Sequence, residues 1–311
     1  MIRRKVILQR ALPALVSIGV LVWLFWSVDL AALVGIMSWR VAAVMLPALV
    51  AYGAATLLLE ALSITRLVDA SGDGLPGWTA ARIKCASYLL GIVNYALGAA
   101  ALTVLLRRRT RLSLGAAASL VILVSSTDLA VVLLTMGGGA ALIETRAPTV
   151  QAGVVVALIF ALFGGLLVLR APRSLGPLDR IRSLAIFEGM RNVRLARLGE
   201  LLLLRACFVG SFIGLGAASF FAFGIWPPLV EQVLGILFVG FIAGLPIAVA
   251  GLGTSQAAFL FIFAEHASQE ALLAQSLALS TGMLALRAMM GLVFAREFTR
   301  EALRETRSAE A

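Results

Sequence analysis

Six long apolar runs constrain the fold of this chain more than any other feature. They are Ala11–Val28, Val41–Leu62, Leu112–Met136, Thr149–Leu169, Leu198–Phe223 and Glu270–Phe294. A helix of about 20 apolar residues crosses the hydrocarbon core of a bilayer. Hydrophobic residues make up 61% of the chain, whereas soluble domains are about 45–50% apolar. The runs therefore predict an all-α polytopic membrane protein with about six full transmembrane helices.

The N-terminal run resembles a signal peptide, because Arg3, Arg4 and Lys5 precede it. However, the bulky side chains of Trp23 and Trp26 lie near its end, and no cleavage site of small residues follows. We therefore expect it to be retained as the first helix. The basic residues before it place the N-terminus in the cytoplasm of a bacterial cell, with the protein in the inner membrane.

Two further apolar regions, Thr79–Leu106 and Leu229–Ala264, are interrupted. In the second, Pro246 removes a backbone donor, and Gly251 and Gly253 loosen the chain that follows. In hydrocarbon, each unpaired backbone group costs several kcal/mol unless protein or trapped water satisfies it. The region is therefore either a tight turn between two membrane helices or a broken, re-entrant segment beside a substrate path.

The arginines favour the re-entrant interpretation. If Thr79–Leu106 crossed the membrane once, the basic cluster after it would lie outside, against the positive-inside rule; the cluster is Arg107, Arg108, Arg109 and Arg111. A hairpin that enters and returns keeps the cluster in the cytoplasm. By the same argument, we expect Leu229–Ala264 to enter the membrane and return to the same face. The last span then places the C-terminus in the cytoplasm. We therefore predict two hairpins that enter from opposite faces.

This topology predicts an inverted repeat. The membrane domain covers residues 1–298, with half repeats of roughly 1–146 and 147–298, and residues 299–311 form a short cytoplasmic tail. A weak similarity in spacing between the two halves of the sequence agrees with this repeat. Pro76 precedes Tyr95 by the same number of residues as Pro227 precedes Pro246.

The segment Leu245–Gly253 resembles the proline–Gly-Gly-like signature of the lysylphosphatidylglycerol synthase transmembrane family, also called flippase-like membrane proteins. Asn94 and the cluster Arg107–Arg109 resemble the family's asparagine and arginine stretch, and Asp128 and Arg287 also fit its pattern. The chain departs from the pattern at Gln256, which stands near a place where an acid is frequent, and at Ser125-Ser126, where charged residues are common.

The resemblance implies a membrane domain that moves lipids or lipid-linked molecules between leaflets. Some members carry a soluble aminoacyl-transferase domain after the membrane domain. Nothing of that size follows Phe298 in this sequence. We therefore do not expect the lipid-aminoacylating activity here.

Ionisable side chains inside the apolar runs each need a reason, because one at a helix centre costs about 2.5–3.5 kcal/mol on insertion scales. Asp128 lies mid-run and is either a structural partner for an arginine or a substrate contact. Arg287 can pair with Asp128 or bind a phosphate bidentately. Glu60, Glu200 and Arg205 lie near the ends of their runs, and we expect them to snorkel to the interface.

The net charge of +10 does not indicate nucleic-acid binding, because the arginines fall between apolar runs rather than on one polar face. Contact with anionic lipid headgroups explains them better. We expect the most basic segment, Arg170–Arg197, to form an amphipathic helix on the inner membrane surface. Cys85, Cys207 and the single His266 form no disulfide or metal pattern, and no motif for a cofactor or nucleotide is present.

The sequence thus predicts a translocator of an anionic lipid or a lipid-linked envelope precursor, with two opposed hairpins forming a polar passage. Arg287 would attract the headgroup, Asp128 would balance its charge, and neutral groups would hydrogen-bond to it. The expected substrate-binding residues are Asn94, Asp128, Pro246, Gly251, Gly253, Gln256 and Arg287. The alternative is a non-catalytic scaffold or accessory subunit that holds an envelope-synthesis enzyme. An enzyme is disfavoured, because no nucleophile–base pair is evident.

Overall fold

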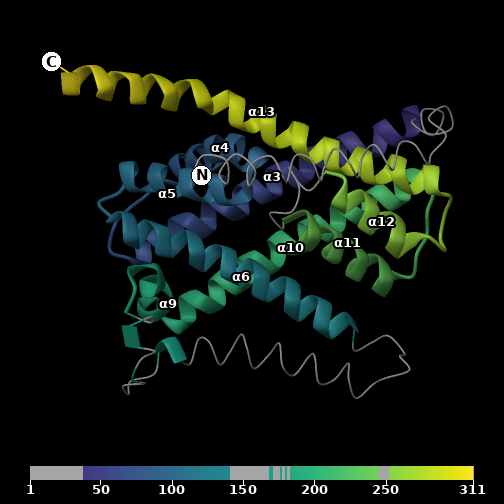
Figure 1. Ribbon diagram of the computed structural model, residues 1–311, viewed down its shortest axis with the longest axis horizontal. Coiled ribbons are helices and arrows are strands. Elements are labelled where there is room, and N and C mark those ends of the chain that lie inside the picture. The colour runs from purple at the N-terminus through teal and green to yellow at the C-terminus, as the bar shows by residue number, and fades with distance from the viewer. Residues whose placement is uncertain are drawn as a thin grey trace, which may run out of the picture. The chain divides into compact units, whose positions relative to one another are not determined.

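The computed structural model describes residues 38–140, 168–170, 176, 179–180, 183–244 and 252–310, and every regular element within these ranges is helical. Figure 1 labels the elements. They are α3 (Trp39–Ala70), α4 (Gly77–Val93), α5 (Tyr95–Arg109), α6 (Leu114–Ala140), η1 (Ala185–Phe187), α9 (Glu188–Asn192), α10 (Leu195–Phe223), α11 (Leu229–Gly244), α12 (Thr254–Phe263) and α13 (Gln269–Glu310).

Four of these helices are long and apolar enough to cross a membrane. They are Trp39–Ala70, Leu114–Gly139, Leu195–Phe223 and the Gln269–Phe294 part of α13. Each matches one of the predicted runs, so the all-α class and the membrane character are confirmed. The run Ala11–Val28 and nearly all of Thr149–Leu169 lie outside the described residues, so the total of six crossings stays a prediction.

The first interrupted region is broken at Asn94, the single non-helical residue between α4 and α5. Its side-chain Oδ1 accepts a hydrogen bond from the Ala96 N–H at 2.8 Å, which caps the start of α5. A Cβ atom on Gly91 would lie 3.7 Å from the Cα of Gly98. Seven residues of straight helix rise about 10 Å, so the chain bends sharply at Asn94.

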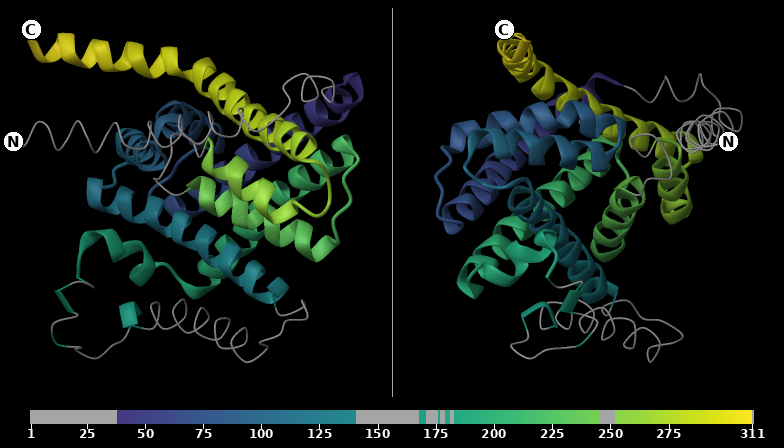
Figure 2. Two further views of the ribbon diagram at one scale, coloured as in Figure 1. Left: turned by 45° about the vertical axis from the view of Figure 1, so that its right-hand side comes forward. Right: turned by 60° about the vertical axis from the view of Figure 1, so that its left-hand side comes forward.

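The second interrupted region forms a helical hairpin of α11 and α12, which lie beside each other in Figures 1 and 2. A Cβ atom on Gly235 would lie 2.3 Å from Cζ of Phe263. Gly235 lies nine residues before the end of α11, and Phe263 lies nine residues after the start of α12. Residues at equal distances from the connection are therefore in contact, so the two helices are antiparallel. With 16 and 10 residues, they rise only about 24 and 15 Å, less than the bilayer core.

The residues form two compact units, each with its own apolar core. Among the described residues, the α12 unit comprises those up to Gly53 and those within Tyr88–Gly98 and Phe212–Leu292, and the α6 unit comprises those within Ala54–Ser87 and Ala99–Ser211 and those from Val293 onward. In the α12 unit, the rings of Phe220, Phe259 and Phe263 pack with centroids 4.8 to 5.7 Å apart.

The core of the α6 unit is aliphatic and joins α3, α4, α5 and α6 through fully or nearly fully buried side chains, among them Leu67, Ile83, Leu106 and Leu123. Each unit thus contains one end of α3 and of α10 together with helices that are too short to cross a bilayer. In the α6 unit this packing also brings charged side chains together, as described below.

The prediction of one amphipathic helix over Arg170–Arg197 is wrong for the part of this segment that the structure describes. There the chain forms the 3₁₀ turn η1 and the five-residue helix α9. The Gly189 N–H donates to the Ser119 hydroxyl on α6 at 2.5 Å, and Arg170 Nε donates to the Met190 carbonyl at 2.7 Å. These hydrogen bonds use backbone groups of the segment, the Gly189 N–H and the Met190 carbonyl. In one unbroken helix the same groups would be paired within the helix and could not bind other side chains.

Asp73 links the α3–α4 loop to the start of the α5–α6 loop. Its carboxylate accepts hydrogen bonds from the Arg111 N–H at 2.5 Å and from the Gly74 N–H at 2.9 Å. These two bonds, the one from Arg111 foremost, lower the pKa of Asp73. Because the pKa of Asp73 is lower in the folded protein than the value of about 3.9 in the unfolded chain, the ionised carboxylate stabilises the fold above that pH. This stabilisation is lost as the pH falls through the folded-state pKa.

We therefore expect Asp73→Asn to lower the melting temperature at pH 7, with the difference from wild type shrinking as the pH falls below about 4. Thermal unfolding in detergent across this pH range measures it. Asp69→Asn, which removes a carboxylate at the end of α3, is the matched control. A difference that stays constant with pH would contradict the role of the Asp73 charge.

Candidate functional site: a buried ion network in the α6 unit

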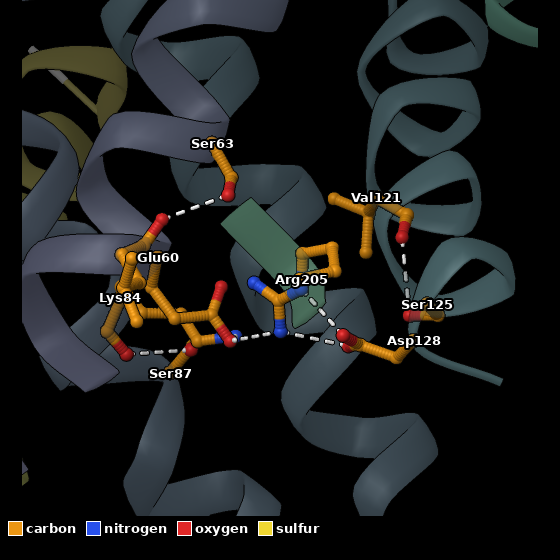
Figure 3. Close-up of polar contacts among 9 residues, drawn as sticks. Glu60, Ser63, Lys84, Ser87, Val121, Ser125, Asp128 and Arg205 are labelled. Carbon is orange, nitrogen blue, oxygen red and sulfur yellow. Dashed lines mark hydrogen bonds and ion pairs between the residues drawn. The ribbon is translucent and has the colours of Figure 1, made fainter. Parts of the chain in front are cut away.

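Four charged side chains from four helices meet inside the α6 unit: Glu60 of α3, Lys84 of α4, Asp128 of α6 and Arg205 of α10. Figure 3 shows Arg205 between the two carboxylates. Its Nε and Nη2 donate to the two oxygens of Asp128, the second at 2.8 Å. Nη2 also donates to Oε1 of Glu60 at 3.3 Å, and Lys84 Nζ lies 3.0 Å from the same oxygen.

Three of the network residues, Glu60, Lys84 and Asp128, each have a serine three residues away on the same helix (Figure 3). The helix faces around the network therefore carry small polar side chains. The Ser63 hydroxyl donates to the Leu59 carbonyl, Ser87 to Lys84, and Ser125 to Val121. Side chains three apart on a helix share a face. The serines therefore leave room for the long Arg205 and Lys84 side chains without adding unpaired donors.

The network is buried and carries no net charge. Arg205 is 0% exposed, Glu60 5%, Lys84 15% and Asp128 22%. The guanidinium also lies over the ring of Phe208, with Cζ 4.0 Å from the ring centroid, a cation–π contact. Buried charges are tolerated when they are paired and hydrogen-bonded, and two cations balance two anions here.

Two polar atoms at the centre of the network have no hydrogen-bond partner among the described residues: Oε2 of Glu60 and Nη1 of Arg205. A buried atom of a charged group left without a partner is costly and needs an explanation. A further polar group bound between these residues would satisfy both atoms. The network is therefore the candidate site of the protein.

The structure changes the predicted roles of the charged residues. Asp128 does pair with an arginine, but that arginine is Arg205, whereas Arg287 is exposed on α13. The prediction that Arg205 and Glu60 snorkel to the interface is wrong. The attraction of Asp128 and Glu60, which belong to two other helices, holds the Arg205 guanidinium inside the protein. Glu200 is instead only partly buried and pairs with an exposed arginine, Arg66, at 3.2 Å.

Gln256 and Gly253 lie together in the α12 unit, where they start α12. Oε1 of Gln256 accepts from the Gly253 N–H at 2.6 Å, and its Nε2 donates to Ser280 of α13 at 3.1 Å. Gly253 has a φ of 89°, which favours glycine. Gln256 and Asn94 thus both cap helix starts, and their contact with substrate stays a prediction. Pro246 and Gly251 lie outside the described residues.

Gln256→Leu is expected to destabilise the protein by about 1–3 kcal/mol, because it leaves the buried Gly253 N–H and the Ser280 hydroxyl without this partner. Ser280→Ala removes only one of the two bonds and should cost less. Unfolding by a denaturing detergent measures both variants. A leucine variant as stable as wild type would show that the amide does not hold α12 in place.

Among the described residues, no group of three or more histidine, cysteine or acidic side chains is placed to hold a metal ion. Cys85 is buried and Cys207 is exposed, and neither is in a disulfide. Comparison of the sequence with protein-family models and with curated proteins gives no match.

Proposed function

We propose that the protein is a flippase-like translocator, which moves an anionic lipid or a lipid-linked envelope precursor across a bacterial inner membrane. The observation that carries the proposal is the ion network. It joins three helices that are long and apolar enough to span a membrane, α3, α6 and α10, to the short helix α4. Ionisable groups inside membrane segments are costly and mark substrate or ion pathways.

The order of elements supports an inverted repeat. A long helix, two short helices and a second long helix follow one another twice, as α3 to α6 and as α10 to α13. When Pro76 is aligned with Pro227, Val93 aligns with Gly244, and these are the last residues of α4 and α11. In our proposal both pairs of short helices are re-entrant and enter from opposite faces, with both termini in the cytoplasm.

The chemistry of the exposed and buried cations suits an anionic headgroup. Arg287 is exposed on α13, so its guanidinium is free to attract a phosphate before translocation. In our proposal the phosphate then competes with Asp128 for the guanidinium donors of Arg205, and Asn94 and Gln256 remain the neutral hydrogen-bonding residues predicted from the sequence. The lipid tails stay in the bilayer throughout. The resemblance to the lysylphosphatidylglycerol synthase transmembrane family agrees with this proposal by analogy.

Translocation of tail-labelled phosphatidylglycerol in proteoliposomes, read by dithionite quenching of the label, tests the proposal. Arg287→Ala is expected to slow translocation about tenfold, the effect of losing a contact of about 1.4 kcal/mol. Met289→Ala, at another exposed position of α13, is the control and should transport normally. Unchanged translocation by a well-folded Arg287→Ala protein would remove Arg287 from the proposed mechanism.

The scaffold alternative rests on the basic segment around α9, where Arg180 and Arg194 are exposed and suit an acidic partner. The scaffold alternative predicts the opposite result for Arg287→Ala. Arg194→Glu would abolish cellular function, while Arg287→Ala would be silent. Wild-type protein that moves no lipid in proteoliposomes would favour this alternative over translocation.

A further inference from the structure

We propose that Asp128 binds the proton whose gradient drives the translocator. This inference rests on the proposed function and deepens it, because it names the ion that moves together with the lipid. The starting observation is the unequal pairing of the two carboxylates in the ion network. Asp128 pairs there with Arg205 alone, whereas Glu60 pairs with both Arg205 and Lys84. A proton needs no cavity, because it binds to a carboxylate oxygen that is already in place.

Asp128 takes up a proton more readily than Glu60. Lys84 Nζ and Arg205 Nη2 lie 3.0 and 3.3 Å from the same oxygen of Glu60, and each nearby cation favours the ionised carboxylate. Asp128 has only one such cation in the network. Its side chain is also 22% exposed, compared with 5% for Glu60, so a proton reaches Asp128 first.

The charged groups around Asp128 come from three other helices. Arg205 of α10 contacts it directly, and Glu60 of α3 and Lys84 of α4 lie beyond Arg205 and act through space. Helix α9 contacts α6 at Ser119, nine residues before Asp128 and so about 13 Å away along the helix. Proton binding at Asp128 is therefore controlled chiefly by its pair with Arg205.

The position of Asp128 suits a proton that crosses the membrane. Asp128 is the fifteenth of the 27 residues of α6, which is long and apolar enough to span a bilayer. Acidic side chains within membrane segments serve in proton relays. Ser125, one turn earlier on the same face, is also only partly buried, so the polar surface of α6 extends from Asp128 toward Ser125 (Figure 3).

Protonation of Asp128 breaks the ionic link of α6 to the rest of the network. An O–H bond forms on the carboxylate, no covalent bond breaks, and the charge attraction to Arg205 is lost. The guanidinium keeps its bond to Glu60 and its contact with the Phe208 ring, which both stabilise the excess positive charge. Arg205 therefore stays inside the protein, while α6 is released.

This release couples the proton to the movement of helices. A ligand shifts a conformational equilibrium only by its difference in affinity for the two states. Asp128 binds a proton more weakly while it is paired with Arg205 than after the two side chains separate. Proton binding and displacement of α6 therefore favour each other, and translocation requires such a displacement in our proposal.

The test is the distribution of tail-labelled phosphatidylglycerol between the two leaflets of proteoliposomes under an imposed pH gradient. Valinomycin and equal potassium on both sides hold the membrane potential at zero. With one proton per lipid, the leaflet ratio should shift about tenfold for each pH unit. Asp128→Asn should abolish the shift, and Asp128→Glu, which keeps a titratable carboxylate, should retain it. Glu200→Gln, at the partly exposed pair with Arg66, should behave as wild type.

Infrared spectroscopy of the purified full-length protein identifies the proton site without transport. As the pH falls, the carboxylic acid band that Asp128→Asn removes should appear before the band that Glu60→Gln removes. Isotopic labelling of the aspartate carboxyls gives the same order in the wild-type protein, so the result does not depend on the folding of a variant. The reverse order would overturn the inference.

The transport results separate this inference from the proposed function. Lipid translocation whose leaflet ratio ignores the pH gradient would refute the inference and leave the proposed function standing. A shift that persists in Asp128→Asn would assign the proton to another group and would also refute the inference. Protonation of Asp128 without any lipid movement would refute the proposed function and its coupling, and only the proton site would remain.

Discussion

Arg205→Met is expected to destabilise the protein by about 3–5 kcal/mol, the cost of removing one partner from a buried ion pair. Arg205 is fully buried and shared by two carboxylates, Glu60 and Asp128. Methionine fills much of the same volume but leaves Asp128 without the cation that neutralises it. Glu60 keeps Lys84, 3.0 Å away, so the main loss is at Asp128.

The double variant Asp128→Asn/Arg205→Met tests this explanation. It removes one charge of each sign and leaves the Glu60–Lys84 pair intact, so we expect it to be more stable than Arg205→Met alone. Arg66→Met is the control, because Arg66 is half exposed and its pair with Glu200 should be worth about 1 kcal/mol or less. Unfolding by a denaturing detergent measures all three variants. Additive losses in the double variant would contradict the pairing.

Gly235→Ala is expected to destabilise the protein by about 1–3 kcal/mol, because the added methyl group overpacks the contact between α11 and α12. The new Cβ would lie 2.3 Å from Cζ of Phe263 and 3.0 Å from Cγ2 of Ile262. Phe263 is itself locked between other buried rings, so it has no free space to move into. The α11–α12 hairpin must therefore open or shift.

Gly244→Ala is the matched control on the same helix, because a Cβ there meets nothing within 4 Å. It should leave stability near that of wild type. Phe263→Leu removes ring atoms from the clash, so the double variant Gly235→Ala/Phe263→Leu should lose less than the sum of the two single losses. A Gly235→Ala protein with wild-type stability would show that the two helices do not pack as closely as the structure has them.

Much of the fold could be predicted from the sequence, because the bilayer imposes a length on every crossing segment. The runs Val41–Leu62, Leu198–Phe223 and Glu270–Phe294 fall within observed helices, and Leu112–Met136 begins two residues before α6 and otherwise lies within it. The two interruptions were also predictable, from Pro246 with its neighbouring glycines and from the basic cluster after Thr79–Leu106. Asn94 marks the first break through its capping side chain, whereas the sequence pointed to it as a substrate-binding residue.

The ion network could not be predicted in the same way. Glu60 and Arg205 lie near the ends of apolar runs, where snorkelling is the ordinary outcome. Lys84 lies before the apolar part of α4, beside Arg82. Hydrophobic pattern shows which face of a helix is polar, but it does not show which helices pack together. Only the packing of α3, α4, α6 and α10 joins these residues to Asp128.

The measurement that most directly tests the central claim, two hairpins entering from opposite faces, is cysteine accessibility at the four hairpin ends. Single cysteines are placed at Gly77, Arg109, Leu229 and Glu265, all exposed in the structure, in a protein whose two native cysteines are replaced. A membrane-impermeant thiol reagent should label the first two only from the cytoplasm and the last two only from outside. Labelling of the two ends of either hairpin from opposite sides would show a simple crossing, and the inverted repeat would then be wrong.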